Sequence, residues 1–197
     1  MLVLASASPR RQELLRNAGI SFVVQASDIP EDALPGESPD ACAQRLAREK
    51  ALAIFQSRSD DYVLGADTIV VIDGLMLNKP ENAGDAARML RLLSGHTHRV
   101  ITGVCLVGGG KSVPGSQFPV PSFVDVRIET TQVSMSAISE GEIQDYIASG
   151  EPMDKAGAYA IQGIASRWIN RIEGDYCNVV GLPVALVYRM LKEHQAI

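Results

Sequence analysis

One carboxylate interrupts a nearly continuous apolar run of the sequence. Asp67 is the only ionisable side chain between Tyr62 and Ile72, and the run predicts a central β-strand. Aspartate is a poor strand former, and its charge is costly to bury without a partner. Three interpretations follow: an ion pair with a lysine such as Lys79, a ligand for a divalent cation, or an acceptor of a proton from water.

A lysine lies in the middle of an apolar helical stripe. The spacing of six residues predicts one buried helix face: Ala43, Leu46, Ala47, Lys50, Ala51 and Ile54. The Lys50 ammonium either extends past its apolar neighbours to solvent or reaches a buried anion. The first outcome is the commoner one for lysines, and the spacing leaves both open.

Two arginines stand at the start of the first predicted helix. Ser6 lies in the preceding turn, Ser8 suits the N-cap and Pro9 suits the first helical position, just before Arg10 and Arg11. A helix N-terminus attracts anions, so two arginines there are unfavourable unless an anion joins them. The cluster indicates either a phosphate site or two solvated surface arginines.

Two further residues complete the candidate chemistry. Glu31 lies in an acidic loop, residues 28–39, and with Asp67 it supplies the oxygen donors that Mg²⁺ uses beside phosphate oxygens. Gln162 lies in a glycine-rich segment, residues 155–163, and its amide can both donate to and accept from a base edge. Basic residues, paired carboxylates and permissive backbone together predict a site for a polyphosphate and a metal ion, most simply a nucleotide site.

The elements that must position these residues alternate between strand and helix. Apolar runs predict strands at 1–5, 21–25, 62–72, 100–107, 123–133 and 168–172, with an Asp73-Gly74 hairpin leading to a further strand at 75–77. Helix signals predict helices at 9–18, at 39–55 with Ser38 as its cap, after Asn82, from a Ser139–Glu142 capping box to Gly150, and at 183–194. Interleaved strands and helices with hairpins predict an α/β fold with a mixed sheet. Residues 108–122, rich in Gly, Pro and Ser, predict a flexible hairpin loop.

Length and composition limit the number of domains, the class of function and the cellular location that the sequence predicts. A chain of 197 residues suits a single domain spanning 1–197, and its net charge of −5 argues against a general nucleic-acid binder. No apolar stretch approaches the roughly 20 residues of a membrane span, and the first residues do not predict a signal peptide. Three separated cysteines predict reduced thiols and a cytoplasmic location. His96 and His98 lack a third ligand nearby, which favours a solvated turn or strand start over a metal site.

Seven motifs, in order along nearly the whole chain, resemble those of the Maf family. They are Leu4–Arg11, Arg45–Ala51, Gly65–Thr68, Lys79-Pro80, Gly150–Pro152, Lys155–Tyr159 and Val180–Pro183. The resemblance implies a mixed twisted sheet with flanking helices, in the two-lobed architecture with a central cleft of the inosine-triphosphate pyrophosphatases. It also implies hydrolysis of nucleoside triphosphates to the monophosphate and pyrophosphate, with Mg²⁺ or Mn²⁺ as cofactor.

Within the family the chain is similar to the dTTP/UTP branch. That likeness assigns specificity to Arg10, Thr68 and Gln162, with modified uridine triphosphates as further substrates. The resemblance also implies that Asp67 accepts the proton and binds the metal together with Glu31. It implies that Lys50 and Lys79 are catalytic residues together with Asp67 and contact the phosphates, and that Ser6 and Arg11 bind the substrate.

A second function belongs to a different class. Maf proteins are linked to inhibition of septum formation, so the alternative is a nucleotide-binding regulator of cell division with little turnover. A binder would not need Asp67 in addition to the basic residues, and this favours the enzyme. The expected partner is a nucleoside triphosphate, with a homodimer as the assembly and no nucleic acid or membrane.

Overall fold

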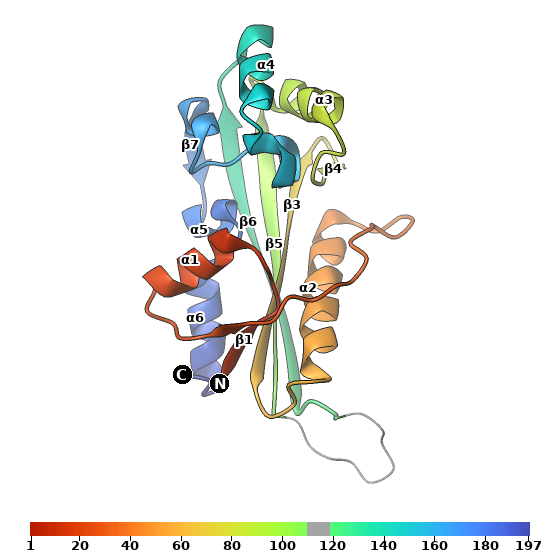
Figure 1. Ribbon diagram of the computed structural model, residues 1–197, viewed down its shortest axis with the longest axis vertical. Coiled ribbons are helices and arrows are strands. Elements are labelled where there is room, and N and C mark those ends of the chain that lie inside the picture. The colour runs from red at the N-terminus through yellow and green to blue at the C-terminus, as the bar shows by residue number, and fades with distance from the viewer. Residues whose placement is uncertain (110–118) are drawn as a thin grey trace. The chain divides into compact units, whose positions relative to one another are not determined.

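The structure is a computed structural model that describes residues 1–109 and 119–197. The expected hairpin loop at 108–122 falls mainly on residues 110–118, which lie outside the described residues. The strands are β1 (Leu2–Leu4), β2 (Val23–Val24), β3 (Tyr62–Ile72), β4 (Leu75–Leu77), β5 (Thr97–Gly108), β6 (Phe123–Met135) and β7 (Ile169–Glu173) (Figure 1). The α-helices are α1 (Pro9–Asn17), α2 (Pro39–Phe55), α3 (Ala83–Leu93), α4 (Glu140–Ala148), α5 (Tyr176–Val180) and α6 (Val184–Glu193), and three 3₁₀ turns are η1 (Glu151–Asp154), η2 (Ala156–Ala158) and η3 (Ile164–Arg167).

Among the described residues, seven strands form one mixed sheet. Its order is β2-β1-β3-β5-β6-β7, and β4 pairs with β3. Strand β1 runs parallel to both β2 and β3, whereas the β3–β4 and β6–β7 pairs are antiparallel. Asp73 and Gly74 both have positive φ, at 49° and 80°, as the tight β3–β4 hairpin requires. The predicted α/β class with a mixed sheet and flanking helices is therefore confirmed.

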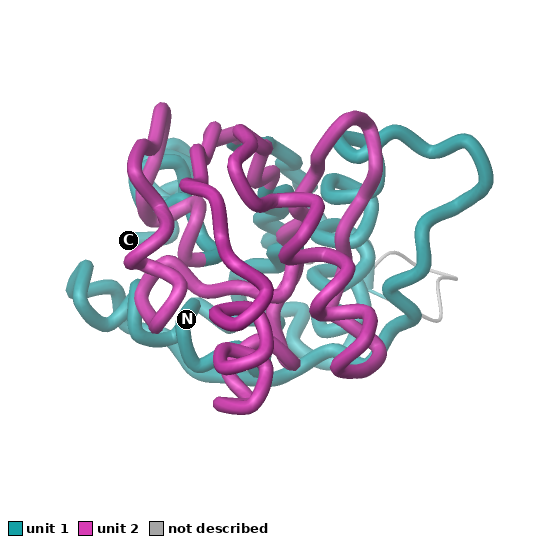
Figure 2. The backbone as a smooth tube through the Cα atoms, turned by 90° about the horizontal axis from the view of Figure 1, so that it is seen from above, with its two compact units in different colours: residues 1–67, 102–129, 181–197 teal, residues 68–101, 130–180 magenta. Residues whose placement is uncertain are grey.

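The chain divides into two compact units (Figure 2). Unit 1 comprises residues 1–67, 102–129 and 181–197, and unit 2 comprises residues 68–101 and 130–180. Strands β3, β5 and β6 each contribute residues to both units. The single domain over 1–197 and the central cleft stay predictions.

In unit 1, alternate strand residues pack against helices on opposite faces. Strand side chains on one face pack with α1 and α6, as in the cluster Leu2, Leu4, Leu15, Leu64, Val104, Leu106, Val187 and Met190. Side chains one residue along pack with α2, as in the cluster Val3, Ala47, Ala51, Ile54, Val63, Cys105 and Val107. This period of two explains why both faces of the strands are apolar.

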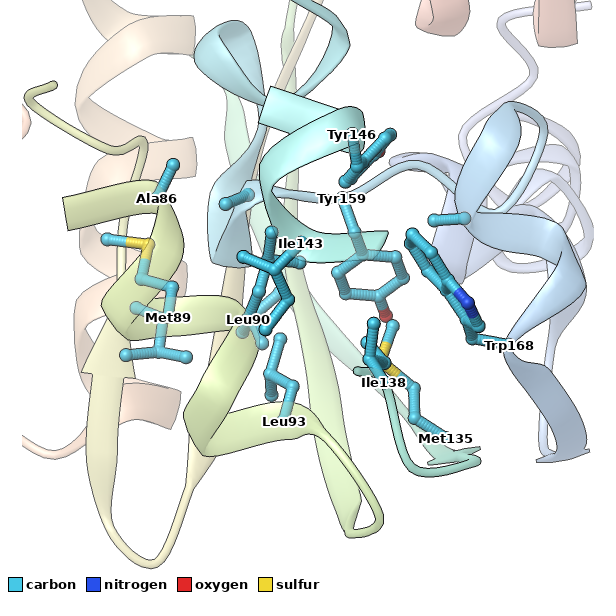
Figure 3. Packing of buried hydrophobic residues seen from close by; sticks show 14 of the residues in the cluster. Ala86, Met89, Leu90, Leu93, Met135, Ile138, Ile143, Tyr146, Tyr159 and Trp168 are labelled. Carbon is cyan, nitrogen blue, oxygen red and sulfur yellow. The ribbon is translucent and has the colours of Figure 1, made fainter. Parts of the chain in front are cut away.

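Unit 2 has its own core around α3 and α4. Figure 3 shows Met89, Leu90 and Leu93 of α3 packed with Ile143 of α4, together with aromatic residues that include Tyr146 and Trp168. Helix α4 begins at the predicted capping box, in which Ser139 and Glu142 each bond the other's backbone. The short helix α5 and the 3₁₀ turns η1 to η3 have no strong apolar period, and the sequence did not predict them.

For the pair His96 and His98, the structure corrects one prediction, the solvent exposure of His98. Thr97 begins β5, so the predicted strand start is confirmed, but His98 is only 2% exposed and is not solvated. Its Nε2 lies 2.7 Å from the Tyr159 hydroxyl, and burial lowers the pKa of His98 to about 4. His98 is therefore a neutral residue of the unit 2 core.

Among the described residues, no helix is long and apolar enough to cross a membrane.

Candidate active site

The turn between β1 and α1 holds Arg11 through the predicted N-cap. Ser8 Oγ accepts from the Arg11 backbone N–H at 3.5 Å, and Pro9 occupies the first helical position as expected. Ser6 Oγ accepts from both the Ser8 N–H and Arg11 Nη1, at 3.3 and 3.1 Å. Ser6 thus fixes the Arg11 side chain to its own turn.

Arg11 also ties this turn to two other segments of unit 1. Its Nη1 donates to the Ala66 carbonyl and its Nε to the Gly181 carbonyl, both at 2.8 Å. Burial lowers the pKa of the Arg11 guanidinium, while the charges of Asp67 and Glu31 act in the opposite direction. Arg10 lies close enough for its charge to lower the pKa of Arg11 as well. The two arginines therefore form a local concentration of positive charge beside two carboxylates, and Arg11 is not a solvated surface arginine.

The centre of the group is a lysine between two acids. Lys50 Nζ donates to Asp67 Oδ1 and to Glu31 Oε1, each at 2.6 Å. The side chains of Lys50 and Asp67 are 8% and 11% exposed, whereas that of Glu31 is 47% exposed. The Lys50 ammonium therefore reaches a buried anion and does not extend to solvent. Asp67 pairs with Lys50, a partner that the sequence did not suggest for it.

Small residues bring α2 close enough to the sheet for this contact. A Cβ at Gly65 would lie 2.2 Å from the Ala47 carbonyl oxygen, and one at Gly103 would lie 2.1 Å from the Ala43 carbonyl oxygen. Glycine at both strand positions lets the helix backbone lie directly on the sheet. Gly65 and Asp67 share a strand face, so the same approach brings Lys50 to Asp67.

A brace that sequence reasoning missed holds the loop carrying Glu31. Arg45 on α2 donates to both carboxylate oxygens of Glu37, at 2.7 and 2.8 Å, and to the Asp32 carbonyl at 3.0 Å. The Arg45 pair lowers the pKa of Glu37 to about 2. Asp32 directly follows Glu31, so Arg45 fixes the backbone beside the metal candidate. The predicted motif Arg45–Ala51 contained this arginine, but its spacing did not reveal the partner.

The remaining candidates belong to unit 2. Thr68 follows Asp67 on β3 and is partly buried, whereas Lys79 and Gln162 are exposed. The structure therefore brings together Ser6, Arg11, Glu31, Lys50 and Asp67 within unit 1. A common site for these five and the unit 2 residues stays a prediction.

The donor set suits a hard cation that also binds substrate. In the part of the chain that the structure describes, no cluster of three or more His, Cys, Asp or Glu side chains could hold a metal ion. Two carboxylates facing one ammonium, Asp67 and Glu31, match the one or two protein ligands that Mg²⁺ takes beside phosphate oxygens and water. The residues present therefore fit a metal ion that arrives with a phosphate.

Comparisons with known proteins cover nearly the whole chain. The family described as "Maf-like protein" matches residues 1–194. The chain is 56% identical to a "dTTP/UTP pyrophosphatase" of Koribacter versatilis, covering 97% of this chain and 93% of that one. A protein of the same name from Geobacter metallireducens is 48% identical, over 97% and 94%. Among solved structures, the Ham1 protein of Staphylococcus aureus matches with a TM-score of 0.46 and 11% identity over 98% of each chain.

Proposed function

Because this chain belongs to the Maf family, we propose that it is a nucleoside triphosphate pyrophosphatase acting on dTTP and UTP. Modified uridine triphosphates are further substrates. The observation that carries the proposal is the Lys50 ammonium between Asp67 and Glu31, beside the buried Arg11 guanidinium. A structural ion pair would need one acid, whereas a site for a triphosphate and a metal needs cations and carboxylates together.

In the proposed reaction, the oxygen of a water molecule attacks the α-phosphorus. Asp67 accepts the proton of that water, and the bond from the α-phosphorus to its bridging oxygen breaks. Pyrophosphate leaves with that oxygen, and the nucleoside monophosphate keeps the oxygen of the water. Four cations stabilise the negative charge on the phosphates: Arg10, Arg11, Lys50 and Lys79.

Asp67 and Glu31 are the residues that would hold a Mg²⁺ or Mn²⁺ ion. When bound, such an ion supplies positive charge to the phosphate oxygens and to the leaving pyrophosphate. Arg45 supports this role of Glu31 by fixing the neighbouring Asp32 carbonyl. Ser6 supports the phosphate contact of Arg11 by holding its guanidinium.

The base preference follows from hydrogen-bond patterns. Uracil and thymine share an acceptor–donor–acceptor edge, to which a glutamine amide such as that of Gln162 can donate and from which it can accept. Cytosine has an amino donor where uracil has an acceptor, and each polar group left unpaired costs about 1–3 kcal/mol. Arg10, Thr68 and Gln162 are the proposed specificity residues.

The test is pyrophosphate release from equimolar UTP, dTTP, CTP, ATP and GTP, with and without Mg²⁺ or Mn²⁺. We expect UTP and dTTP to be preferred over CTP by about tenfold to a hundredfold, and only when metal is present. Preference for a purine triphosphate would overturn the substrate assignment. Tight nucleotide binding without pyrophosphate release would instead favour the regulator of cell division.

We further propose a cytoplasmic location and a homodimer. The three cysteines are free thiols in the structure, which suits a reducing compartment. Light scattering on the purified protein tests the dimer, and a mass equal to that of one 21.1 kDa chain would overturn this proposal.

A further inference from the structure

The segment that carries Gln162 is a tight turn in unit 2. The Gly163 N–H donates to the Ala160 carbonyl at 3.2 Å, which places Ile161 and Gln162 at the two central positions. Ile161 is buried and Gln162 is exposed, so the turn is anchored by an apolar side chain and presents an amide.

Two side chains from outside the turn clamp both of its ends. The Ala160 N–H donates to the Tyr146 hydroxyl oxygen at 3.3 Å. The Ile164 N–H donates to the Glu151 carboxylate, with distances of 3.1 and 3.2 Å to its two oxygens. The Tyr146 hydroxyl in turn donates to Glu151 Oε1 at 2.9 Å, which links the two clamping groups. The bracing hydrogen bonds of this turn thus come from Tyr146 and Glu151.

Neighbouring residues hold the two clamping side chains, Tyr146 and Glu151, in place. Tyr146 lies in the unit 2 core, where its ring packs edge-on against Trp168 with centroids 5.3 Å apart (Figure 3). Burial and the neighbouring Glu151 raise the pKa of the Tyr146 hydroxyl, so it stays a donor at neutral pH. Gly163 makes room for the carboxylate, because a Cβ there would lie 2.0 Å from Glu151 Oε1. A turn fixed at one end by the buried Tyr146 and at the other by the partly buried Glu151 can hold one exposed amide in a defined direction.

We propose that Glu151 and Tyr146 are positioning residues that orient Gln162 for recognition of the pyrimidine edge. This inference rests on the proposed function and adds Glu151 and Tyr146, as residues that act through Gln162, to the proposed specificity residues. A glutamine that is free to rotate gains little selectivity, because each productive contact must first order its side chain. With the turn fixed, that cost is reduced for UTP and not for the mismatched CTP.

A double-mutant cycle tests the coupling. We would measure kcat and KM with UTP and CTP for the wild type, Glu151→Gln, Gln162→Ala and the double variant. Glu151→Gln keeps the shape of the side chain and weakens the clamp. We expect it to lower the UTP/CTP ratio of kcat/KM by about tenfold, mainly through a higher KM for UTP. In the Gln162→Ala background the same change should leave the ratio unaltered.

Two further variants keep the test independent of folding. Tyr146→Phe removes only the hydroxyl and should lower the ratio in the same direction. Gly163→Ala displaces the Glu151 carboxylate without changing it and should resemble Glu151→Gln. The matched control is Tyr176→Phe at an exposed tyrosine of unit 2, which should leave the ratio unchanged.

The outcomes separate the two proposals. Wild-type protein that releases no pyrophosphate from UTP overturns the proposed function, and the positioning role with it. Active wild type with additive effects in the cycle, or with equal losses of kcat for UTP and CTP in Glu151→Gln, overturns the positioning role alone. Active wild type with a coupled loss of selectivity supports both.

Discussion

The two acids that share Lys50 differ in what surrounds them. Asp67 lies on a buried strand, and its pair with Lys50 offsets the cost of removing both charges from water. Glu31 lies on a loop and is about half exposed, so solvent can stabilise its charge without Lys50. When a triphosphate competes for the ammonium, Glu31 therefore loses less than Asp67. This asymmetry suits Asp67 as the proton acceptor and Glu31 as an adaptable metal ligand.

Asp67→Asn should abolish hydrolysis. The amide cannot accept the proton of the attacking water, and loss of a general base costs at least about 10²-fold in rate. Lys50 keeps Glu31 as a charged partner, so the free energy of unfolding should fall by only about 1.5–3 kcal/mol, the value of one hydrogen bond to a charged group. Pyrophosphate release and urea unfolding measure the two effects. Near-normal turnover by the folded variant would remove Asp67 from the catalytic role.

Lys50→Met should lower the activity on triphosphates while it largely preserves the packing of α2. Methionine keeps most of the apolar stem on the stripe of α2 and removes the ammonium, which leaves the buried Asp67 carboxylate without that partner. We expect kcat/KM for UTP to fall by about 10²-fold or more, consistent with the loss of a phosphate contact in a buried site. Arg48→Met is the control, because it removes a positive charge from the exposed side of the same helix. Full activity in Lys50→Met would contradict the phosphate role.

At the scale of elements, local sequence signals correctly predicted the helix caps and the hairpin, because these features depend on residues close together in the sequence. The Ser8 and Ser38 caps, the Asp73-Gly74 hairpin and the capping box of α4 are all present as expected. The stripe of α2 correctly placed Lys50 on the apolar face of the helix, because helical period is a local property, but it left open whether the ammonium reaches solvent or a buried anion.

The same reasoning could not predict contacts between segments that are distant in the sequence. Nothing in the spacing pairs Arg45 with the Asp32 carbonyl or Tyr146 with the Ala160 N–H, since these bonds depend on how separate elements pack. Likewise, the sequence around His98 gave no sign that Tyr159 would cover it 61 residues later. The sequence left open whether Asp67 pairs with a lysine, binds a divalent cation or accepts a proton from water. Only the close approach of α2 at Gly65 brings Lys50 to it.

His98 makes the stability of the protein sensitive to mild acid. Its pKa falls from 6.5 to about 4 on folding, so above pH 6.5 it is neutral in both states and has no effect. Between pH 6.5 and 4 the unfolded chain binds the proton and the folded chain does not, so stability falls with pH. The loss attributable to His98 should reach about 2 kcal/mol between pH 7.5 and 5.

His98→Gln is the variant that measures this contribution. Glutamine does not titrate and can still hydrogen-bond the Tyr159 hydroxyl. Urea unfolding of both proteins should show that the free energy of unfolding falls between pH 7.5 and pH 5. The fall should be about 2 kcal/mol smaller in the variant than in the wild type. Equal drops in the two proteins would mean that His98 is protonated in the folded state.

The charge of the whole molecule and that of the candidate site have opposite signs. The chain carries a net charge of −5, yet the predicted site collects Arg10, Arg11, Lys50 and Lys79. At physiological ionic strength, exposed charges more than about 8 Å away are largely screened. Local cations therefore decide whether a triphosphate binds, and the acidic remainder of the surface disfavours longer polyanions such as nucleic acids.

Binding of a triphosphate should raise the melting temperature of the whole chain. A ligand that binds only the folded state at 100 times its Kd adds about 2.7 kcal/mol, which for a chain of this length corresponds to roughly 5–10 °C. We expect this shift with a non-hydrolysable UTP analogue and Mg²⁺, and a much smaller one with the CTP analogue at the same concentration. Lys50→Met, compared with its own unliganded melting temperature, should lose most of the shift because its phosphate contact is gone. Arg48→Met should keep the shift, since its charge lies on the exposed side of α2. Equal shifts for the two analogues would contradict recognition of the base, whereas an undiminished shift in Lys50→Met would contradict the assignment of Lys50 to the phosphates.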